Sequence, residues 1–373
     1  MQRIRKRPEI RETIVFLFSN LRQMDWIEAV ISDLSKDYEI FILALYPEEQ
    51  EWLEGMRSPS TTINVVRFCK PNNIFRAVID LHRVLGITKS RIVVAHGFYA
   101  SIAAVVAGKI RLLTRVITVR HHGRGHYENF LLNGLDRFIS NYSNKIIAIS
   151  ELTKRLLLSE GVGANKIIVL PNAIDVDKFY CVPNKPRDVV LSEFGFDDSN
   201  FVIGVISRFV DWKGIRFIIE AFVQILETNP EARLVLANSN RGNSSLEELL
   251  AKIDQKFIFR IDDVGDIPSF YRSLDVFVHT PISFDAEPFG LVYLEGLASG
   301  TNCVFTKSGV IHDLREIERY AWLVDFNSSE EIECSIRSVI EGGNKEKISL
   351  EYLADFTIET YVRNFRKFVF DVL

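Results

Sequence analysis

The sequence predicts an α/β protein built from two parallel sheets, each covered by helices. Short apolar runs alternate with longer amphipathic segments, which is the pattern of strands and crossover helices. A polar segment with two prolines at 181–200 interrupts this pattern, which then starts again. A chain of 373 residues also exceeds the usual size of one hydrophobic core, so two domains are expected.

Six apolar runs in the first half are interpreted as strands, because each is short and bounded by polar or turn-forming residues. They lie at 13–19, 39–45, 91–97, 115–121, 145–150 and 166–172. Amphipathic segments between them predict helices, for example at 25–37 and 150–161. In the second of these helices, Ser150 suits an N-cap and Gly161 suits the end.

The second half repeats the pattern. Strands are predicted at 201–207, 232–238, 257–261, 276–281, 302–306 and 321–325. We interpret 181–200 as the linker, which gives one domain at 1–182 and a second at 183–354. The last segment, 357–373, is aromatic and amphipathic and predicts a final helix.

Composition narrows the class of protein. With 47% hydrophobic and 25% charged residues, the chain has the composition of an ordinary globular protein. No apolar run has the length of a transmembrane helix, and the basic N-terminus lacks the apolar core of a signal peptide. The four scattered cysteines predict free thiols in a reducing compartment, so we expect a cytoplasmic protein. They are Cys69, Cys181, Cys303 and Cys334.

Charge is distributed unevenly along the chain. Residues 1–180 hold 25 Lys and Arg against 18 Asp and Glu, a net charge of +7, whereas the remainder has a net charge of −11. This polarity predicts that the first domain faces something anionic, such as the inner membrane surface or a phosphorylated lipid acceptor. Divergence in charge without a function is the alternative. Nucleic acid is not expected, because the sequence has no aromatic-rich basic stripe or recognition motif.

The segment SFDAEPFGLVYLEGLASG (283–300) carries two acids, Glu287 and Glu295, eight positions apart. Pro288 and Gly290 disfavour a continuous helix through the first acid. We therefore expect Glu287 on a loop and Glu295 inside a helix that begins near Gly290.

Backbone N–H groups at the start of that helix, at Gly290, Leu291 and Val292, form a site for phosphate together with the positive end of the helix dipole. Ionised carboxylates nearby accept hydrogen bonds from hydroxyl groups. A phosphate site beside two such acceptors predicts a nucleotide-sugar pocket.

Glu-Pro-Phe-Gly followed by a second Glu in this register resembles the signature of the family 4 retaining glycosyltransferases of the GT-B fold. The segment 204–222 is similar to the Gly-x-x-x-Arg-(x)-Lys-Gly segment of that family. Segments 148–162 and 169–179 are similar to its interdomain region. Together these segments cover roughly residues 115 to 315.

The resemblance implies two Rossmann-like domains whose parallel sheets face a central cleft, with helix 355–373 packing back on the first domain. It implies a nucleotide-sugar donor, of the UDP or GDP type, on the second domain. It further implies retaining transfer to a saccharide or lipid-linked acceptor, as in the synthesis of cell-surface polysaccharide or glycolipid. The base, the donor sugar and the acceptor stay open, and no cofactor is expected.

Arg208 and Lys213 follow the predicted strand 201–207, which contains Gly204 and ends at Ser207. Cations at the carboxyl edge of a parallel sheet suit a diphosphate leaving group. The sequence has no suitably placed Asp-x-Asp motif, so we expect these two cations to act without a metal ion. The alternative is an ordinary surface role, with Arg208 paired to Asp211.

By resemblance, Glu295 would bind the ribose hydroxyls, and Glu287 would contact the donor sugar and stabilise its positively charged transition state. Two positions depart from the family pattern near this site. Ser308 replaces the first glycine of a Gly-Gly loop, and Asn302 replaces a proline. Both departures bear on the choice of donor sugar.

In the first domain, a strand leads into His121 and His122. By resemblance, His122 corresponds to a family histidine near the donor sugar and its phosphate. A metal site formed with His126 is disfavoured, because no acidic or cysteine partner has supporting spacing. Arg120 and Arg124 are candidates for binding an anionic acceptor.

The first strand–helix loop, within 18–26, lacks the glycine pair that is common in the family. Ser19 and Asn20 would have to supply side-chain donors there. His96 is interpreted as structural. The alternatives to transfer are a catalytically inactive partner that binds nucleotide-sugar or glycan, a GT-B epimerase and, less favoured, a phosphorylase.

Overall fold

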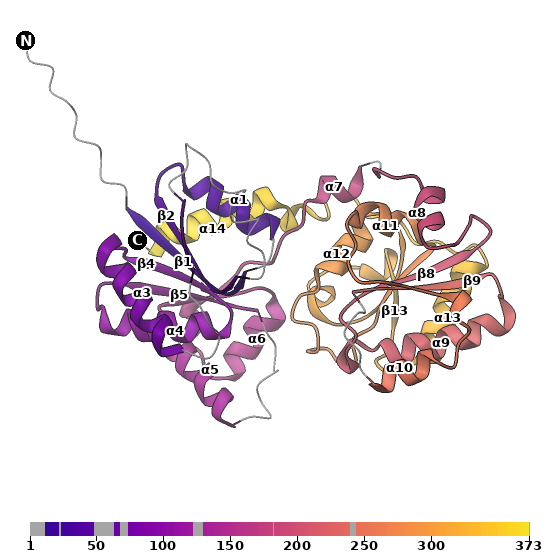
Figure 1. Ribbon diagram of the computed structural model, residues 1–373, viewed down its shortest axis with the longest axis horizontal. Helices are drawn as coiled ribbons and strands as arrows, with labels where there is room; N and C mark the ends of the chain where they lie inside the picture. Colours follow the sequence, from indigo (N-terminus) through magenta and orange to yellow (C-terminus); the bar gives the residue numbers. More distant parts are fainter. Residues whose placement is uncertain are drawn as a thin grey trace, which may run out of the picture. The chain divides into compact units, whose positions relative to one another are not determined.

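The computed structural model divides into two compact units (Figure 1). Unit 1 comprises Met1–Ile149, Thr153–Pro171 and Ile358–Leu373, and unit 2 comprises Ser150–Leu152 and Asn172–Thr357. The structure describes residues 12–21, 24–47, 63–67, 74–121, 130–181, 183–238 and 244–372.

Unit 1 contains a seven-stranded parallel sheet with the order β3-β2-β1-β4-β5-β6-β7. Its strands are β1 Thr13–Leu21, β2 Glu39–Pro47, β3 Ile63–Arg67, β4 Ile92–His96, β5 Arg115–Arg120, β6 Lys145–Ala148 and β7 Ile167–Val169. The sequence predicts all of these except β3. That strand lies at the sheet edge, where fewer apolar residues are needed than in a central strand. Its sequence includes the polar residues Asn64 and Arg67, so it lacks a long apolar run.

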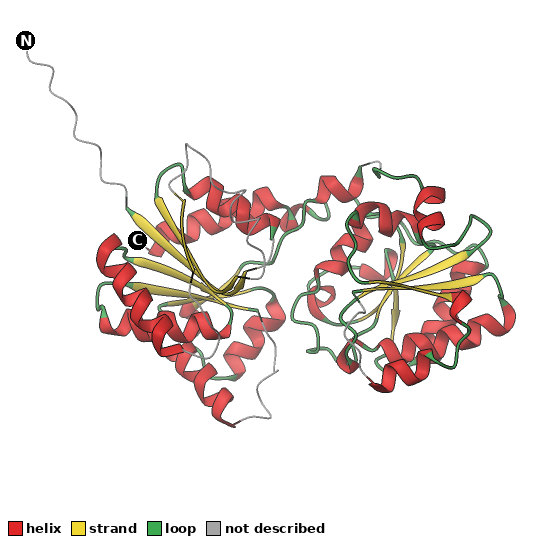
Figure 2. Ribbon diagram, viewed as in Figure 1, coloured by secondary structure: helices red, strands yellow, loops and turns green. Residues whose placement is uncertain are grey.

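Helices cover both faces of this sheet (Figure 2). They are α1 Asp25–Leu34, α3 Ile74–Thr88, α4 Phe98–Ile110, α5 Phe130–Tyr142, α6 Glu151–Ser159 and α14 Ile358–Val372. Helices α1 and α14 lie side by side on one face, and α3, α4 and α5 cover the other (Figure 1). Arg366 of α14 pairs with Asp33 of α1 at 2.9 Å, and Phe365 stacks on Phe16 of β1. The C-terminal helix therefore belongs to unit 1.

Unit 2 contains a six-stranded parallel sheet with the order β10-β9-β8-β11-β12-β13. Its strands are β8 Phe201–Ile206, β9 Ala232–Ala237, β10 Ile258–Ile261, β11 Val276–His279, β12 Asn302–Thr306 and β13 Trp322–Val324. Its helices are α7 Val176–Tyr180, α8 Arg187–Glu193, α9 Ile215–Thr228, α10 Ser244–Leu250, α11 Ile267–Ser273, α12 Leu291–Ala298 and α13 Ser329–Ile340. Apolar residues of α9, α10 and α13 pack with those of the strands in one continuous core.

The segment interpreted as a linker, 181–200, is part of unit 2. Helix α8 packs on α11, and Arg187 pairs with Asp275 at 2.8 Å. The preceding helix α7 packs on α12, and the long segment of unit 2 begins at Asn172. The prolines and polar residues of this segment reflect short helices and turns on the surface of the unit.

Each sheet contains one point where the strand order reverses. In unit 1 this switch point lies between β1 and β4, and in unit 2 it lies between β8 and β11. Ligands of open α/β sheets bind at the carboxyl ends of the strands beside such points. Within the described ranges, no helix is both long enough and apolar enough to cross a membrane.

Candidate functional site

A cluster of ionisable side chains lies at the switch point of unit 2. Lys213, from the loop after β8, forms an ion pair with Glu287, from the loop after β11. Nε2 of His279, the last residue of β11, lies 3.3 Å from Oε2 of the same carboxylate. Only 11% of the Lys213 and Glu287 side chains is exposed, so water screens this pair weakly.

Gly214 brings the two loops together. It adopts a φ of +71°, and a Cβ at this position would lie 1.8 Å from the carbonyl oxygen of Thr280. The loop after β8 therefore touches the backbone of the loop after β11, which only glycine allows. Helix α9 begins at the next residue, Ile215, so the contact also fixes Lys213 at the helix start.

Burial and the mutual contacts shift the pKa values of all three side chains. Burial favours the neutral form of Glu287, but the hydrogen bond to His279 and the charge of Lys213 outweigh it and lower the pKa of this carboxyl to about 2. Burial lowers the pKa of Lys213, and Glu287 opposes that shift. Burial also lowers the pKa of His279, so this imidazole is neutral at pH 7. Because Nδ1 has no partner among the described residues, the Nε2–H group is the donor to Glu287.

Arg208 adds a second cation at the same edge. It is exposed, and its Cζ lies 5.0 Å from the centroid of the Trp212 ring, while Nζ of Lys213 lies 4.6 Å from that centroid. In the part of the chain that the structure describes, no carboxylate pairs with Arg208, and Asp211 does not. The indole thus holds two cations beside each other, and one of them is available to an anionic ligand.

Helix α12 begins as the sequence predicts, with Gly290 as N-cap at a φ of +79°. A Cβ at Gly290 would lie 2.6 Å from the Tyr293 ring. Leu291 and Val292 are the first helical residues, so their N–H groups have no partner within the helix. Glu295 lies in the second turn, where it accepts a hydrogen bond from the Tyr271 hydroxyl at 3.0 Å.

The loop after β12 packs against the Glu-Pro-Phe-Gly segment. The N–H group of Val310 donates to the carbonyl of Phe289 at 2.8 Å. Gly309 has a φ of +56°, and a Cβ there would lie 2.3 Å from that carbonyl oxygen. Ser308, the departure from the family glycine, is buried and hydrogen-bonds through its hydroxyl to that of Tyr293. This serine therefore fixes the loop.

The candidate residues Gly204 and Ser207 lie in β8 and directly after it. Ser207 follows β8 at its carboxyl end, where its hydroxyl donates to the carbonyl of Arg208 at 3.0 Å. Gly204 lies inside β8, and a Cβ there would lie 2.2 Å from the Leu274 side chain. The close approach of Leu274 explains why this strand position carries glycine, and a contact of Gly204 with substrate stays a prediction.

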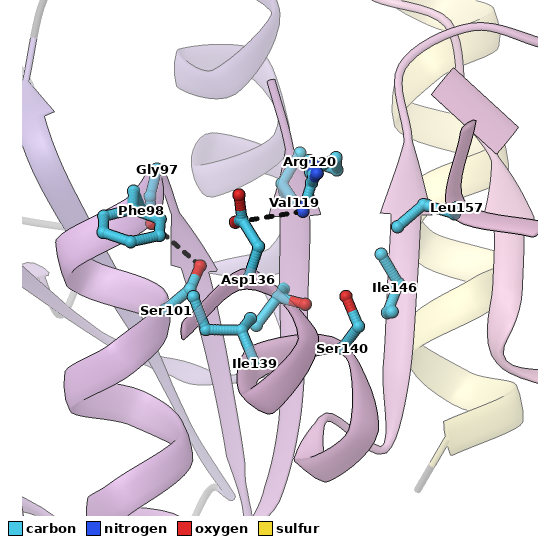
Figure 3. A pocket seen from close by; sticks show the side chains of 11 residues that line it. Gly97, Phe98, Ser101, Val119, Arg120, Asp136, Ile139, Ser140, Ile146 and Leu157 are labelled. Carbon is cyan, nitrogen blue, oxygen red and sulfur yellow. Dashed lines mark hydrogen bonds and ion pairs between the residues drawn. The ribbon is translucent and has the colours of Figure 1, made fainter. Parts of the chain in front are cut away.

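Arg120 of unit 1 lies among the lining residues of a small pocket, where it contacts Asp136 (Figure 3). It pairs with Asp136 of α5 at 3.1 Å and with Glu160 at 3.0 Å, and all three side chains are buried. Gly97, Ser101 and Arg120 line a small pocket together with apolar residues. The prediction that Arg120 binds an anionic acceptor is wrong, because two carboxylates already surround its guanidinium group.

The switch point of unit 1 carries histidines and aromatic rings. His96 ends β4, stacks on Phe18 with ring centroids 4.8 Å apart, and places Nδ1 3.2 Å from Nε2 of His121. Burial, and then the neighbouring His121, hold the pKa of His96 well below its usual value. The hydroxyl of Ser19 accepts a hydrogen bond from the N–H group of Ala100 at 2.9 Å, so it caps α4.

Several predicted residues fall outside this description. His122, Arg124 and His126 lie outside the described residues. The backbone of Asn20 belongs to β1, where it pairs with Tyr46, but its side chain also lies outside the description. Among the described residues, no group of three metal-ligating side chains is positioned to hold a metal ion.

Sequence reasoning missed four residues of the unit 2 site. They are Trp212, Tyr271, His279 and Tyr293. His279 was the most accessible to prediction, because it is a polar residue that ends the otherwise apolar run of β11. Tyr271 and Tyr293 resemble ordinary core residues in the sequence, because only the fold places their hydroxyls beside Glu295 and Ser308.

The sequence matches two models of known protein families. The sequence model of the family described as "Glycosyl transferases group 1" matches residues 187–352, within unit 2. The model described as "Glycosyltransferase Family 4" matches residues 34–178, which lie mostly in unit 1. The first match contains the whole ionisable cluster of the switch point.

Two related sequences match part of the chain. Mannosylfructose-phosphate synthase of Agrobacterium fabrum is 28% identical over 202 residues, which are 50% of this chain and 43% of that protein. A GDP-mannose-dependent monoacylated alpha-(1-6)-phosphatidylinositol monomannoside mannosyltransferase of Corynebacterium glutamicum is 30% identical over 146 residues, which are 38% of either chain. The chain thus spans less than half the length of these two relatives.

A solved structure matches nearly the whole chain. The crystal structure of Anabaena Alr3699/HepE in complex with UDP-glucose has a TM-score of 0.80 and 17% sequence identity, covering 96% of this chain and 99% of that chain. At this identity the similarity shows the fold.

Proposed function

The chain belongs to the family 4 glycosyltransferases of the GT-B fold, and on this basis we propose that it transfers a sugar from a nucleoside diphosphate sugar to a hydroxyl acceptor. The observation that carries this proposal is the cluster of Lys213, Glu287 and His279 at the switch point of unit 2. It combines a buried cation with a carboxylate that stays ionised, which suits a ligand with both phosphate and hydroxyl groups.

The two cations would stabilise the departing diphosphate. Arg208 offers a planar fork to phosphate oxygens, and Lys213 offers a compact charge in a poorly screened position. The N–H groups at the start of α12 add donors for the same phosphates. These groups together supply the positive charge that other transferases obtain from a divalent metal ion, so we propose transfer without a metal.

We propose that the transfer retains the configuration at the anomeric carbon. The bond from this carbon to the diphosphate oxygen breaks, and the acceptor oxygen forms its bond on the same face of the sugar. The acceptor proton passes to the departing phosphate oxygen, which becomes basic as the bond breaks. Glu287, ionised and held by Lys213 and His279, would accept hydrogen bonds from the sugar and stabilise its positive charge.

Glu295 would bind the ribose hydroxyls. Its carboxylate is oriented by the Tyr271 hydroxyl and lies one turn after Leu291 and Val292. The name of the C. glutamicum relative includes GDP-mannose, and the Anabaena structure contains UDP-glucose, so donors of the UDP and GDP types are the first to test. The former is also named for a phosphatidylinositol glycolipid, which supports a saccharide or lipid-linked acceptor in polysaccharide or glycolipid synthesis. We propose a cytoplasmic protein that acts at the inner face of the membrane.

The first experiment is calorimetric titration with UDP, GDP and ADP in the presence of a chelator. We expect one nucleotide to bind with micromolar affinity, and Lys213→Ala and Glu295→Ala each to weaken binding by about 1.5–3 kcal/mol. Lys256→Ala and Glu248→Ala are matched controls, since they remove exposed charges elsewhere in unit 2. Absence of binding by all three nucleotides would favour a catalytically inactive partner.

The second experiment follows donor turnover by NMR. Transfer with an unchanged anomeric configuration supports the proposal, and an inverted product contradicts the retaining mechanism. Conversion of the donor sugar into an epimer without an acceptor would favour an epimerase. Activity that requires an added divalent metal would contradict the role given to Arg208 and Lys213.

A further inference from the structure

Glu287 lies in an irregular loop between β11 and α12, where the backbone carbonyls need partners from other segments. One of these partners comes from the start of α6. The hydroxyl of Ser150 donates to the carbonyl of Pro288, the residue after Glu287, at 2.7 Å. Ser150 immediately precedes α6 and is completely buried, and 138 positions separate it from Pro288. Because unit 2 includes Ser150–Leu152, this contact lies within one unit.

The loop after β12 contacts the same end of α6. The N–H group of Glu151, the first residue of the helix, donates to Oδ2 of Asp313 at 3.1 Å. This N–H group has no partner within the helix, so the carboxylate caps the helix and lies at the positive end of its dipole. The N–H group of Asp313 in turn donates to the carbonyl of Val310 at 2.8 Å. The cap therefore belongs to the same turn of chain that binds Phe289 through the Val310 N–H group.

The stem of the Glu287 side chain lies beside one glycine of each loop. A Cβ at Gly290 would lie 2.9 Å from Cγ of Glu287, and a Cβ at Gly309 would lie 3.1 Å from the same atom. The two loops therefore enclose this stem. A movement of either loop would shift the carboxylate away from Lys213 and His279.

We infer that Ser150 and Asp313 are positioning residues, through which the start of α6 fixes the direction of the Glu287 carboxylate. The inference deepens the proposed transfer reaction and rests on it for the role of Glu287. A displacement of about 1 Å at a reacting group can lower a rate on the order of a hundredfold. Arg208 and Glu295 lie on other segments, so nucleotide affinity should depend much less on these two contacts.

The first test measures amide hydrogen exchange of the full chain and needs no turnover. Ser150→Ala removes the donor to Pro288, so the amides of residues 289–293 and of Val310 should exchange about fivefold faster. Ser273→Ala is the matched control, because its hydroxyl is also buried and donates to a backbone carbonyl at 2.7 Å. That carbonyl, of Phe270, belongs to the same helix as Ser273, so exchange at residues 289–293 should stay unchanged.

The second test separates turnover from binding. Ser150→Ala and Asp313→Ala should each lower kcat about tenfold and leave the Kd of the nucleotide within about twofold of the wild type. Asp313→Asn keeps an oxygen that can cap α6, so it should restore most of kcat. Asp254→Ala is the control for the carboxylate, because Asp254 also accepts a backbone N–H group at 3.1 Å, that of Lys256, but lies elsewhere in unit 2.

Unchanged exchange in Ser150→Ala, or an equal increase in Ser273→Ala, would overturn the inference whatever reaction the protein catalyses. Faster exchange with an unchanged kcat would overturn it as well, because the contacts would then hold the loops without orienting Glu287. Equal losses of kcat and nucleotide affinity would show that they support the whole donor site instead. Absence of transfer by the wild type would count against the proposed function alone, and thermal unfolding of each variant identifies misfolding.

Discussion

In both units the strand beside the switch point ends in a buried histidine, His96 or His279, but the residues around that histidine differ. At the switch point of unit 2, Lys213, Glu287 and His279 form a buried ionised cluster. At the switch point of unit 1, the corresponding strand end carries His96, stacked on Phe18, whose pKa is held low by burial. The repeated fold supplies the location, and the loop residues decide whether charged or uncharged side chains surround it.

The difference extends to how each unit uses its buried cation. In unit 1, Arg120 pairs with two buried carboxylates, and all three groups lie in the interior. In unit 2, Lys213 shares one carboxylate with a neutral histidine and lies beside the exposed Arg208. In unit 1 the carboxylates outnumber the cation, whereas in unit 2 the cations outnumber the carboxylate.

The largest effect is expected from Arg120→Met. Removing this cation leaves Asp136 and Glu160 buried without it, which should lower the free energy of unfolding by about 3–5 kcal/mol. Nucleotide binding per folded molecule should stay as in the wild type, because the donor cluster lies in unit 2. Urea unfolding and calorimetry measure the two quantities. If Arg120→Met kept wild-type stability but lost nucleotide binding, Arg120 would contact the ligand, which contradicts the structural role given to it here.

The glycines at the two switch points provide a matched pair. A Cβ at Gly214 would meet the backbone oxygen of Thr280 at 1.8 Å, whereas one at Gly97 would meet the Ser19 hydroxyl at 2.8 Å. Both positions have positive φ, but only the serine side chain can rotate away. We expect Gly214→Ala to cost about 3 kcal/mol of stability and Gly97→Ala about 1–2 kcal/mol. Equal losses in urea unfolding would contradict this account.

Acid pH should lower the stability of unit 2 through the protonation of Glu287. The pKa of Glu287 is lowered from 4.5 to about 2, so its ionisation stabilises the folded state above pH 4.5, and this contribution is lost as the pH falls toward 2. The contribution is on the order of 3 kcal/mol. Denaturant unfolding between these pH values should show the loss in the wild type and a smaller one in Glu287→Gln. His279→Leu should move the loss to higher pH, because it removes a donor to the carboxylate.

The smallest effect is expected from Tyr271→Phe. It removes the hydroxyl that donates to Glu295, so nucleotide affinity should fall by about 1 kcal/mol, less than in Glu295→Ala. Tyr361→Phe is the control, since this buried tyrosine belongs to α14 of unit 1. If Tyr271→Phe weakened binding as much as Glu295→Ala, the tyrosine rather than the carboxylate would be the main ribose contact.

The fold was predictable because apolar runs mark buried parallel strands directly. The edge strand β3 escaped prediction, since Asn64 and Arg67 break its apolar run. The positions of Glu287, Glu295 and Lys213 were also predictable, because motif spacing relative to a strand end or helix start fixes them locally. Arg120 was not predictable, because its carboxylate partners lie 16 and 40 positions away and only the tertiary fold brings them to it.

The position of α14 has a consequence for the order of events during synthesis. Phe365 is completely buried against unit 1, yet the ribosome adds it after every residue of unit 2. While the chain is being made, the face of β1 that carries Phe16 has no permanent cover, whereas unit 2 already has all its strands. Unit 2 can therefore reach its native state first, although its sequence begins later. An expressed fragment that ends before Ile358 would retain this exposed apolar face, so unit 1 requires α14 as well as its strands.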